Sequence, residues 1–290
     1  MSIQPKILVT GAGGQLGRRV VHHLLKSVPA AQVTPLVRNS AAASSFSALG
    51  VEARIGDYAQ PETLERAFAG VQRLLLISSN AMGQRGTQHR NVIDAAKRAG
   101  VTTIVYTSIL HADTSPLGLA DEHRETEADL QASGIPYVIL RNGWYTENYT
   151  ASIPAALAHS VFLGSAGEGR IASAARDDYA EAAAVVLTAT DVGAGRIYEL
   201  AGDLAYTLAQ FAEELSRQTG KSIPYKNLSE ADYEAVLVGA GLPAPLAALL
   251  ADSHTGASKG ALEDKGRQLS TLIQRPTTRL GASIATALAN

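Results

Sequence analysis

Short apolar runs alternate with longer segments whose apolar residues recur at helical spacing through the first half of the chain. The short runs are dense in Val, Ile and Leu and lack a polar face, as expected of strands buried on both sides of a parallel sheet. These runs predict strands at Ile7–Thr10, Val33–Val37, Val51–Ile55, Arg73–Ile77, Thr103–Thr107 and Pro136–Leu140. The intervening segments predict helices at Gln15–Ser27, Ser40–Leu49, Pro61–Ala69, Gln84–Ala99 and Leu117–Ala132. The alternation predicts an α/β fold with a doubly wound, Rossmann-like parallel sheet.

The alternation weakens after Tyr145. The remaining pattern predicts helices at Asp177–Thr190, Thr207–Thr219, Ser229–Gly239 and Pro245–Ala251, with a strand at Arg196–Leu200. We therefore expect a Rossmann-like domain over residues 1–145 and a smaller C-terminal α/β lobe over residues 146–290, on the substrate side. Residues 177–200 are a segment of the second half that can instead pack back on the main sheet.

Composition narrows the function classes. The chain has 290 residues, 46% of them hydrophobic, which is enough for a sizeable core. Its net charge of −2 gives no reason to expect nucleic acid or a membrane surface as a partner. There is no cysteine, no apolar run of transmembrane length and no secretory signal, so we expect a cytoplasmic protein. The histidines lack metal-ligand spacing, and no metal site is predicted. These features leave the oligomeric state undefined.

A glycine-rich turn carries the first functional signal. The apolar run from Ile7 ends in Gly11, Gly14 and Gly17, and a helical pattern begins at once. A strand, a tight turn and a helix N-terminus together bind a dinucleotide pyrophosphate through backbone N–H groups and the positive end of the helix dipole. The spacing GxxGxxG differs from the standard GxGxxG. The turn residues expected at the cofactor are Gly11, Ala12, Gly13, Gly14, Gln15 and Leu16.

Charge indicates which dinucleotide binds. An NAD-binding unit usually places an acidic residue about 20 residues past the glycines, where it binds the ribose hydroxyls. Here the first acidic residue of the chain is Glu52, and Arg38 directly follows the second strand. A guanidinium at this point suits the 2′-phosphate of NADP(H), because it can hold two phosphate oxygens at once. The alternative is that Arg38 is a solvated residue at a strand end.

Other polar residues follow the remaining strands. In doubly wound folds ligands bind at the carboxyl ends of the strands, so these residues are candidates for the site. Ser78, Ser79 and Asn80 are expected on the ribose side of the cofactor. Asp57 is expected near the adenine, or else as a simple cap of the turn after Gly56.

The chain resembles the atypical short-chain dehydrogenases/reductases of the NmrA-like group. Within that group it is similar to the bacterial type 2 NAD(P)H:quinone oxidoreductases and, more loosely, to triphenylmethane reductases. The matching segments cover nearly the whole length and are Thr10–Gly17, Val37–Asn39, Leu75–Ser79, Gln88–Ile93, Tyr106–His123, Leu140–Tyr145 and Gly256–Gly260. The resemblance implies NADPH-dependent reduction of quinones in the cytoplasm.

The resemblance also exposes a difference in the catalytic residues. Ordinary members of the superfamily use a Ser with a Tyr and a Lys spaced as YxxxK. Ser108 takes the place of the serine, but His123 and Glu127 stand where Tyr and Lys belong. A quinone accepts hydride to give a weakly basic phenolate, whereas a ketone builds up alkoxide charge and needs a placed acid. Loss of the triad therefore fits a quinone or a similar flat, electron-poor acceptor.

Catalytic roles are expected past the fifth and sixth strands. Asn142 and Gly143 are expected near the nicotinamide, and Asn142 can bond its carboxamide or the quinone oxygen. Trp144 and Tyr145 offer flat surfaces for a ring, with the Tyr145 hydroxyl as a hydrogen-bond donor; Trp144 fits a core aromatic equally well. His111 is a candidate donor to the phenolate, or a structural residue.

Two further alternatives stay open for Ser108 and His123. Ser108 is either a pocket hydroxyl or a turn residue. His123 is expected to pack on its own helix rather than touch substrate.

Two other functions fit the same sequence. One is a non-enzymatic NADP(H) sensor of the NmrA type, which binds the dinucleotide and contacts another protein. The other is a reductase of triphenylmethane, azo or nitro compounds. A flavin is not expected, because the single phosphate-binding turn is assigned to the dinucleotide.

Overall fold

The computed structural model describes residues 5–289, which form two compact units. The first unit contains the chain up to Ile109 together with Glu122–Asn142 and Asp177–Tyr198. The second contains Leu110–Asp121, Gly143–Arg176 and the chain from Glu199 onward. Residues 1–4 and 290, which belong to the two predicted domains, lie outside the described residues.

A seven-stranded sheet organises the first unit, with the strand order β3-β2-β1-β4-β5-β6-β8. Its strands are β1 (Ile7–Val9), β2 (Val33–Val37), β3 (Arg54–Ile55), β4 (Arg73–Leu76), β5 (Thr103–Ile109), β6 (Tyr137–Asn142) and β8 (Arg196–Leu200). The pairs from β3 to β6 are parallel. The order reverses beside β1, which is the switch point where such folds bind ligands. The predicted doubly wound sheet is confirmed.

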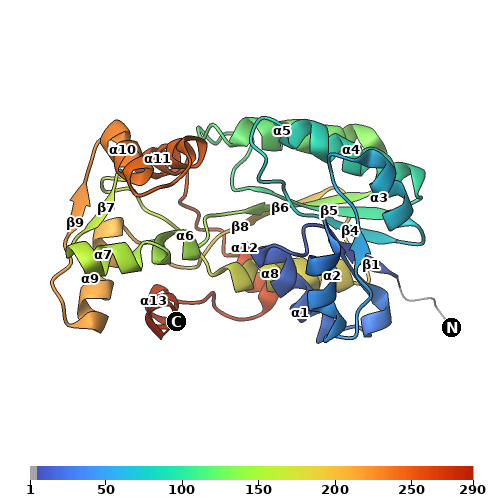
Figure 1. The fold of residues 1–290 in the computed structure, drawn as a ribbon, viewed down its shortest axis with the longest axis horizontal. Coiled ribbons are helices and arrows are strands. Elements are labelled where there is room, and N and C mark those ends of the chain that lie inside the picture. The colour runs from blue at the N-terminus through green and yellow to red at the C-terminus, as the bar shows by residue number, and fades with distance from the viewer. Residues whose placement is uncertain (1–4, 290) are drawn as a thin grey trace. The chain divides into compact units, whose positions relative to one another are not determined.

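Helices cover both faces of this sheet (Figure 1). In the figure α3 (Pro61–Phe68), α4 (Arg85–Arg98) and α5 (Ala120–Ser133) lie on one face, and α1 (Gln15–Leu25), α2 (Ser40–Ser47) and α8 (Arg176–Thr188) lie on the other. A short 3₁₀ helix, Ala30–Gln32, precedes β2. Local signals set the helix ends: the Asn39 side chain caps α2, and Pro61 occupies the first turn of α3.

Alternate residues of the central strands point to the same face of the sheet and form the main core of the first unit. Leu74 and Leu76 of β4 and Ile104 and Tyr106 of β5 belong to one apolar cluster that also contains Val92 of α4. All five side chains have no exposed surface. The Tyr106 hydroxyl forms a hydrogen bond with His123 Nδ1 at 2.7 Å. This packing fixes α4 and α5 against the strands whose carboxyl ends carry the predicted site.

The second unit is mostly helical. Its helices are α6 (Glu147–Thr150), α7 (Ile153–His159), α9 (Leu208–Thr219), α10 (Glu230–Gly239), α11 (Ala244–Ser258), α12 (Gln268–Ile273) and α13 (Leu280–Ala289). β7 (Phe162–Gly164) pairs in parallel with β9 (Tyr225–Asn227). A capping box between Thr207 and Gln210 starts α9, and Gly220 ends it in the left-handed conformation.

The two units of the structure are not separated by the single boundary after Tyr145 that the sequence pattern predicts. Leu110–Asp121 groups with the second unit, where Leu110 packs in an apolar cluster with Ala172. Asp177–Tyr198 groups with the first unit, which is the alternative placement that the sequence allows. Within the described part of the chain, every helix is too short or too polar to span a bilayer.

Candidate active site

The glycine-rich turn follows β1 and leads directly into α1. Gly11 has a φ of +58°, which favours glycine, and the Gly14 N–H donates to the Gly11 carbonyl at 2.9 Å. A Cβ at Gly17 would lie 2.5 Å from that carbonyl oxygen, so the helix approaches the turn this closely only with glycine there. Glycine is therefore required for the tight turn at Gly11 and for the close contact between helix and turn at Gly17.

The N-terminus of α1 has the electrostatics of an anion site. Gly14 is its N-cap and provides no side-chain cap, and the first turn contains no acidic residue. The positive end of the helix dipole is therefore not neutralised by a carboxylate of the same turn. Arg18 adds a positive charge nearby, since its Nε donates to the Gly13 carbonyl at 3.1 Å.

Arg38 directly follows β2 and is exposed. Among residues 5–289, none forms a hydrogen bond or an ion pair with its guanidinium. The next residue, Asn39, accepts a hydrogen bond from the Ala42 N–H at 2.9 Å and so fixes the backbone beside it. Arg38 thus combines a fixed main chain with a cation that is available to a ligand.

The loop after β3 contains Asp57, for which a role is predicted, and its neighbour Tyr58. Asp57 accepts a hydrogen bond from the Ala59 N–H at 2.9 Å, which is the turn-capping role weighed against contact with adenine. Tyr58 had no predicted role. Its hydroxyl bonds the Thr10 side chain, and also the Ile77 carbonyl at 2.9 Å, so it holds the residue before Gly11. Burial raises the pKa of Tyr58.

The loop after β4 is held by side chains from α4. The Ser79 N–H donates to His89 Nε2 at 2.9 Å, and the Ser79 hydroxyl donates to Gln88. The Ser78 N–H donates to the Thr107 hydroxyl at 2.9 Å. Because the hydroxyl hydrogen of Ser79 is used inside the protein, this side chain can meet a ribose only as an acceptor. The ribose contacts of Ser78, Ser79 and Asn80 stay predictions.

A buried ion pair joins Arg141 to Glu127, the residue expected at the place of the superfamily's lysine. Glu127 accepts from Arg141 Nε at 3.0 Å and Nη2 at 2.7 Å, and also from the Ser108 hydroxyl at 2.6 Å. His123 is buried, and its Nδ1 meets the Tyr106 hydroxyl at 2.7 Å. Burial and the charge of Arg85 hold the pKa of His123 well below its usual value. The Glu127 carboxylate and the His123 ring are therefore each bonded to other groups of the protein.

The end of β6 presents an unsatisfied amide. Asn142 is 6% exposed, and its Oδ1 has no hydrogen-bond partner among the described residues. A buried polar atom without a partner is costly unless a ligand satisfies it. The carboxamide nitrogen of a nicotinamide is a suitable donor.

The following residues, in the second unit, have contacts of their own. The Gly143 N–H donates to the Leu200 carbonyl at 2.7 Å. Trp144 is buried, which agrees with the core-aromatic alternative. Tyr145 is half-buried, and the Arg176 guanidinium lies 4.7 Å from its ring centroid.

His111, in the second unit, lies between two carboxylates. Its Nδ1 is 3.6 Å from Glu199 and its Nε2 is 3.3 Å from Asp264. Its backbone has a φ of +51°, and its N–H donates to Glu199 at 2.8 Å. Both ring nitrogens thus face carboxylates, and a role as donor to a phenolate stays a prediction. No local pattern predicts this arrangement, because Glu199 and Asp264 lie far from His111 along the chain.

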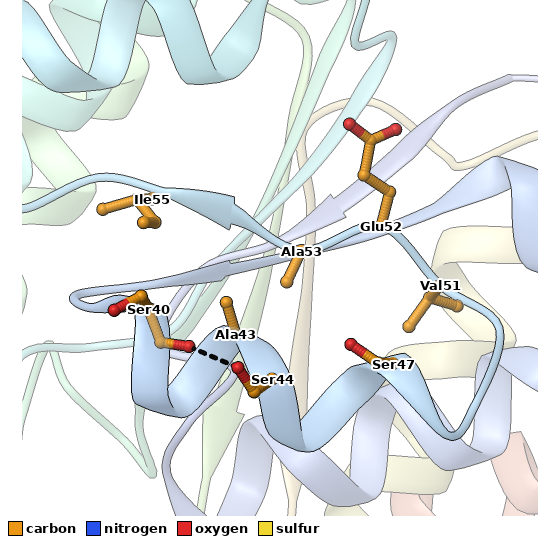
Figure 2. Close-up of a pocket in the computed structure, with 8 residues that line it drawn as sticks. All are labelled: Ser40, Ala43, Ser44, Ser47, Val51, Glu52, Ala53 and Ile55. Atoms are coloured by element: carbon orange, nitrogen blue, oxygen red, sulfur yellow. Dashed lines mark hydrogen bonds between the residues drawn. The ribbon is translucent and has the colours of Figure 1, made fainter.

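An open pocket of about 330 Å³ lies between α2 and the chain leading into β3 (Figure 2). Its lining residues are Ser40, Ala43, Ser44, Ser47, Val51, Glu52, Ala53 and Ile55. None of them is a predicted site residue, and their side chains bring no cation to the pocket. Across residues 5–289, no group of three or more His, Cys, Asp or Glu is placed to hold a metal ion.

The glycine turn, the switch point beside β1 and the available arginine after β2 define a dinucleotide-binding protein. Residues 11–190 match the model of the NAD(P)H-binding family, and the chain belongs to that family. It is 58% identical over 280 residues to quinone oxidoreductase 2 of Escherichia coli (strain K12), covering 96% of this chain and 97% of that protein.

Two solved structures show the same likeness in three dimensions. The crystal structure of the NADPH-dependent quinone oxidoreductase from E. coli, complexed with NADPH, has a TM-score of 0.94 and 57% identity, covering 98% of this chain and 100% of that one. The Citrobacter sp. triphenylmethane reductase complexed with NADP(H) has a TM-score of 0.92 and 38% identity, covering 97% and 99%. The predicted likeness to type 2 quinone oxidoreductases is confirmed.

Proposed function

We propose that the chain is an NADPH-dependent reductase that transfers hydride to quinones without a Ser–Tyr–Lys triad. The observation that carries the proposal is that Glu127 binds both the Ser108 hydroxyl and the Arg141 guanidinium, so that neither Ser108 nor Glu127 has a proton to give to a substrate. A flat acceptor that gives a stable phenolate does not require such an acid. The full-length likeness to the E. coli quinone reductase supports the same substrate class.

The residues of the first unit fit NADP(H). The turn from Gly11 to Leu16, at the uncapped start of α1, would hold the pyrophosphate. Arg38 would hold the 2′-phosphate, and Asn142 Oδ1 would accept a hydrogen bond from the nicotinamide carboxamide. When bound, NADPH supplies a hydride from C4 of its nicotinamide.

The overall reaction balances without a further redox partner. A quinone gains a hydride, with its electron pair, and one proton to become a hydroquinone, while NADPH becomes NADP+. The chain contributes mainly by holding the two reactants together, which replaces a bimolecular encounter by a reaction within one complex. The proton comes from water or from a weak donor.

Residues at the start of the second unit would contact the acceptor. The half-buried Tyr145 ring, braced by Arg176, offers a flat surface and a hydroxyl for the acceptor oxygen. His111 is the second candidate donor, although it must leave a carboxylate to act. Trp144 would support the ring platform from the core. The cytoplasm stays the predicted compartment.

One other acceptor class has an observation in its favour. The triphenylmethane reductase is 38% identical over nearly the whole chain, and its dyes are also flat and electron-poor. Dye reduction is therefore a second candidate activity of the same site.

The test is an acceptor assay with the purified protein. NADPH oxidation is followed with benzoquinone, menadione, a triphenylmethane dye or no acceptor, and NADH is run in parallel. We expect quinone-dependent oxidation that favours NADPH. Faster turnover of the dye would assign the second candidate instead. Binding of NADPH without turnover of any acceptor would support a sensor and overturn the proposal.

A further inference from the structure

One face of α4 reaches the loops that follow β3 and β4. The residues of this α4 face are Arg85, Gln88, His89 and Asn91. Three of them bind a single residue, Ser79: Arg85 Nε donates to its carbonyl at 2.7 Å, Gln88 accepts from its hydroxyl, and His89 accepts from its N–H. All polar groups of Ser79 are therefore engaged by α4.

The fourth residue reaches the other loop. Asn91 Nδ2 donates to the Tyr58 carbonyl at 2.9 Å. The Tyr58 hydroxyl in turn bonds the Thr10 side chain, which also accepts from the Ile77 N–H at 3.0 Å. Asn91 is thus linked through one tyrosine to the residue that opens the glycine-rich turn. The α4 face supports the two loops in which the sequence predicts cofactor contacts at Asp57 and at Ser78–Asn80.

His89 is the buried centre of this arrangement. It has no exposed surface, and its Nδ1 meets the Thr126 hydroxyl at 2.9 Å. The Thr126 hydroxyl hydrogen goes to the Glu122 carbonyl at 2.9 Å, so Nδ1 is the donor, while Nε2 must accept from Ser79. The ring is therefore neutral and carries its hydrogen on Nδ1. Burial and Arg85 lower the pKa of His89 to about 3, which agrees with this state.

We propose that Gln88, His89 and Asn91 are positioning residues that preset the loops after β3 and β4 for NADP(H). The inference rests on the proposed function, because it takes these loops as the cofactor edge. Neither His89 nor Asn91 needs to touch the cofactor. Their hydrogen bonds fix the main chain before binding, so the loops lose little conformational freedom when the cofactor arrives.

The neighbouring Arg90 provides a matched control. It lies between His89 and Asn91 in sequence but points to α5, where it pairs with Glu125 at 2.8 Å and Asp129 at 3.1 Å. Its side chain is about half exposed. Arg90→Gln therefore alters the same helix without touching either loop.

The test compares cofactor affinity with stability. His89→Phe keeps an aromatic ring but removes the acceptor of the Ser79 N–H and the Nδ1 donor to the Thr126 hydroxyl oxygen. Asn91→Ala removes the donor to the Tyr58 carbonyl. We expect each change to raise the Kd for NADPH by about five- to tenfold, as for the loss of a hydrogen bond. The Kd is measured from NADPH fluorescence, with the acceptor KM and kcat at saturating NADPH and the thermal midpoint alongside.

The outcomes separate the two proposals. A raised Kd for NADPH in the test variants, with their acceptor KM and kcat close to those of the parent, supports positioning. In the Arg90→Gln control, the Kd for NADPH should also stay close to that of the parent. A lowered thermal midpoint with an unchanged Kd overturns it and leaves only a structural role. If His89→Phe does not fold, Asn91→Ala and Gln88→Ala, at half-buried positions, decide the question by the same criterion. Failure of the parent itself to bind NADPH would instead overturn the proposed function.

Discussion

Two parts of the same sheet edge treat their charged groups in opposite ways. At the end of β2, Arg38 is exposed and has no ion-pair partner among residues 5–289. Near the end of β6, Arg141 is buried and is bonded at two points to the buried Glu127 of α5. The first arrangement leaves a charge for a ligand, whereas the second uses its charges to hold the protein together.

The contrast indicates where the binding energy and the chemistry come from. A buried, fully bonded ion pair has neither a free proton nor a free lone pair to give to a substrate, so Glu127 cannot replace the missing acid. An exposed guanidinium keeps its full capacity for a phosphate. The proposed function therefore relies on placement of the cofactor rather than on acid–base catalysis by Ser108 or Glu127.

The largest effect is expected from breaking the buried pair. Glu127→Gln keeps the shape of the side chain but leaves the Arg141 cation without a charged partner. Removing one member of a buried pair costs about 3–5 kcal/mol, and urea unfolding should show a loss of this size. Glu125→Gln, on the same helix, removes an exposed partner of Arg90 and should cost less than about 1 kcal/mol. Equal losses in the two variants would show that burial does not distinguish them.

The exposed cation should control cofactor choice. Arg38→Ala removes the expected contact with the 2′-phosphate, and a hydrogen bond to a charged group is worth about 1.5–3 kcal/mol. The KM for NADPH should rise by about 10- to 100-fold, while the KM for NADH stays close to that of the parent. Arg66→Ala, an exposed arginine on α3, serves as the control. An unchanged preference for NADPH would remove Arg38 from the site.

Acid should lower the stability of the protein through His89 of α4. The pKa of His89 is lowered from its ordinary 6.5 to about 3, so the unfolded chain binds more protons between these values. The free energy of unfolding should therefore fall as the pH drops below about 6.5, by up to about 1.4 kcal/mol per pH unit for this residue. Urea unfolding of the parent and of His89→Phe across this range measures the difference. Identical pH slopes would show that His89 contributes nothing to the acid sensitivity.

Local signals were sufficient to predict one of these two regions but not the other. The glycine turn and Arg38 each directly follow a predicted strand, and in the structure they lie after β1 and β2. Their contacts with a cofactor stay predictions. The pairing of Glu127 with Arg141 depends on how α5 packs against β6, which no local pattern specifies. The carboxylates around His111 could not be predicted for the same reason, because Glu199 and Asp264 are distant in sequence and come close to it only in the folded chain.

Strand lengths show the same limit. The run Val51–Ile55 predicts five residues, but β3 contains only Arg54–Ile55, because it is an edge strand that pairs through two residues of β2. β6 extends to Asn142 because its register with β5 continues to Ile109. The three-residue strands β7 and β9 are too short to carry a period and form only by pairing across a long stretch of chain.

The smallest effect is expected at Ser108, where the comparison between the two regions is most direct. Its hydroxyl donates its hydrogen to Glu127 at 2.6 Å, so the side chain belongs with the Glu127–Arg141 ion pair. The family resemblance, in contrast, aligns it with a catalytic serine. In Ser108→Ala, Glu127 Oε1 still accepts from Arg141 Nε, and the ion pair is retained. We expect kcat with menadione to fall by less than about tenfold, against the roughly 100- to 10,000-fold expected for loss of a general acid. Tyr145→Phe in the same assay tests the alternative donor. A large loss of kcat confined to Ser108→Ala would show that the serine takes part in the reaction and does not merely hold Glu127.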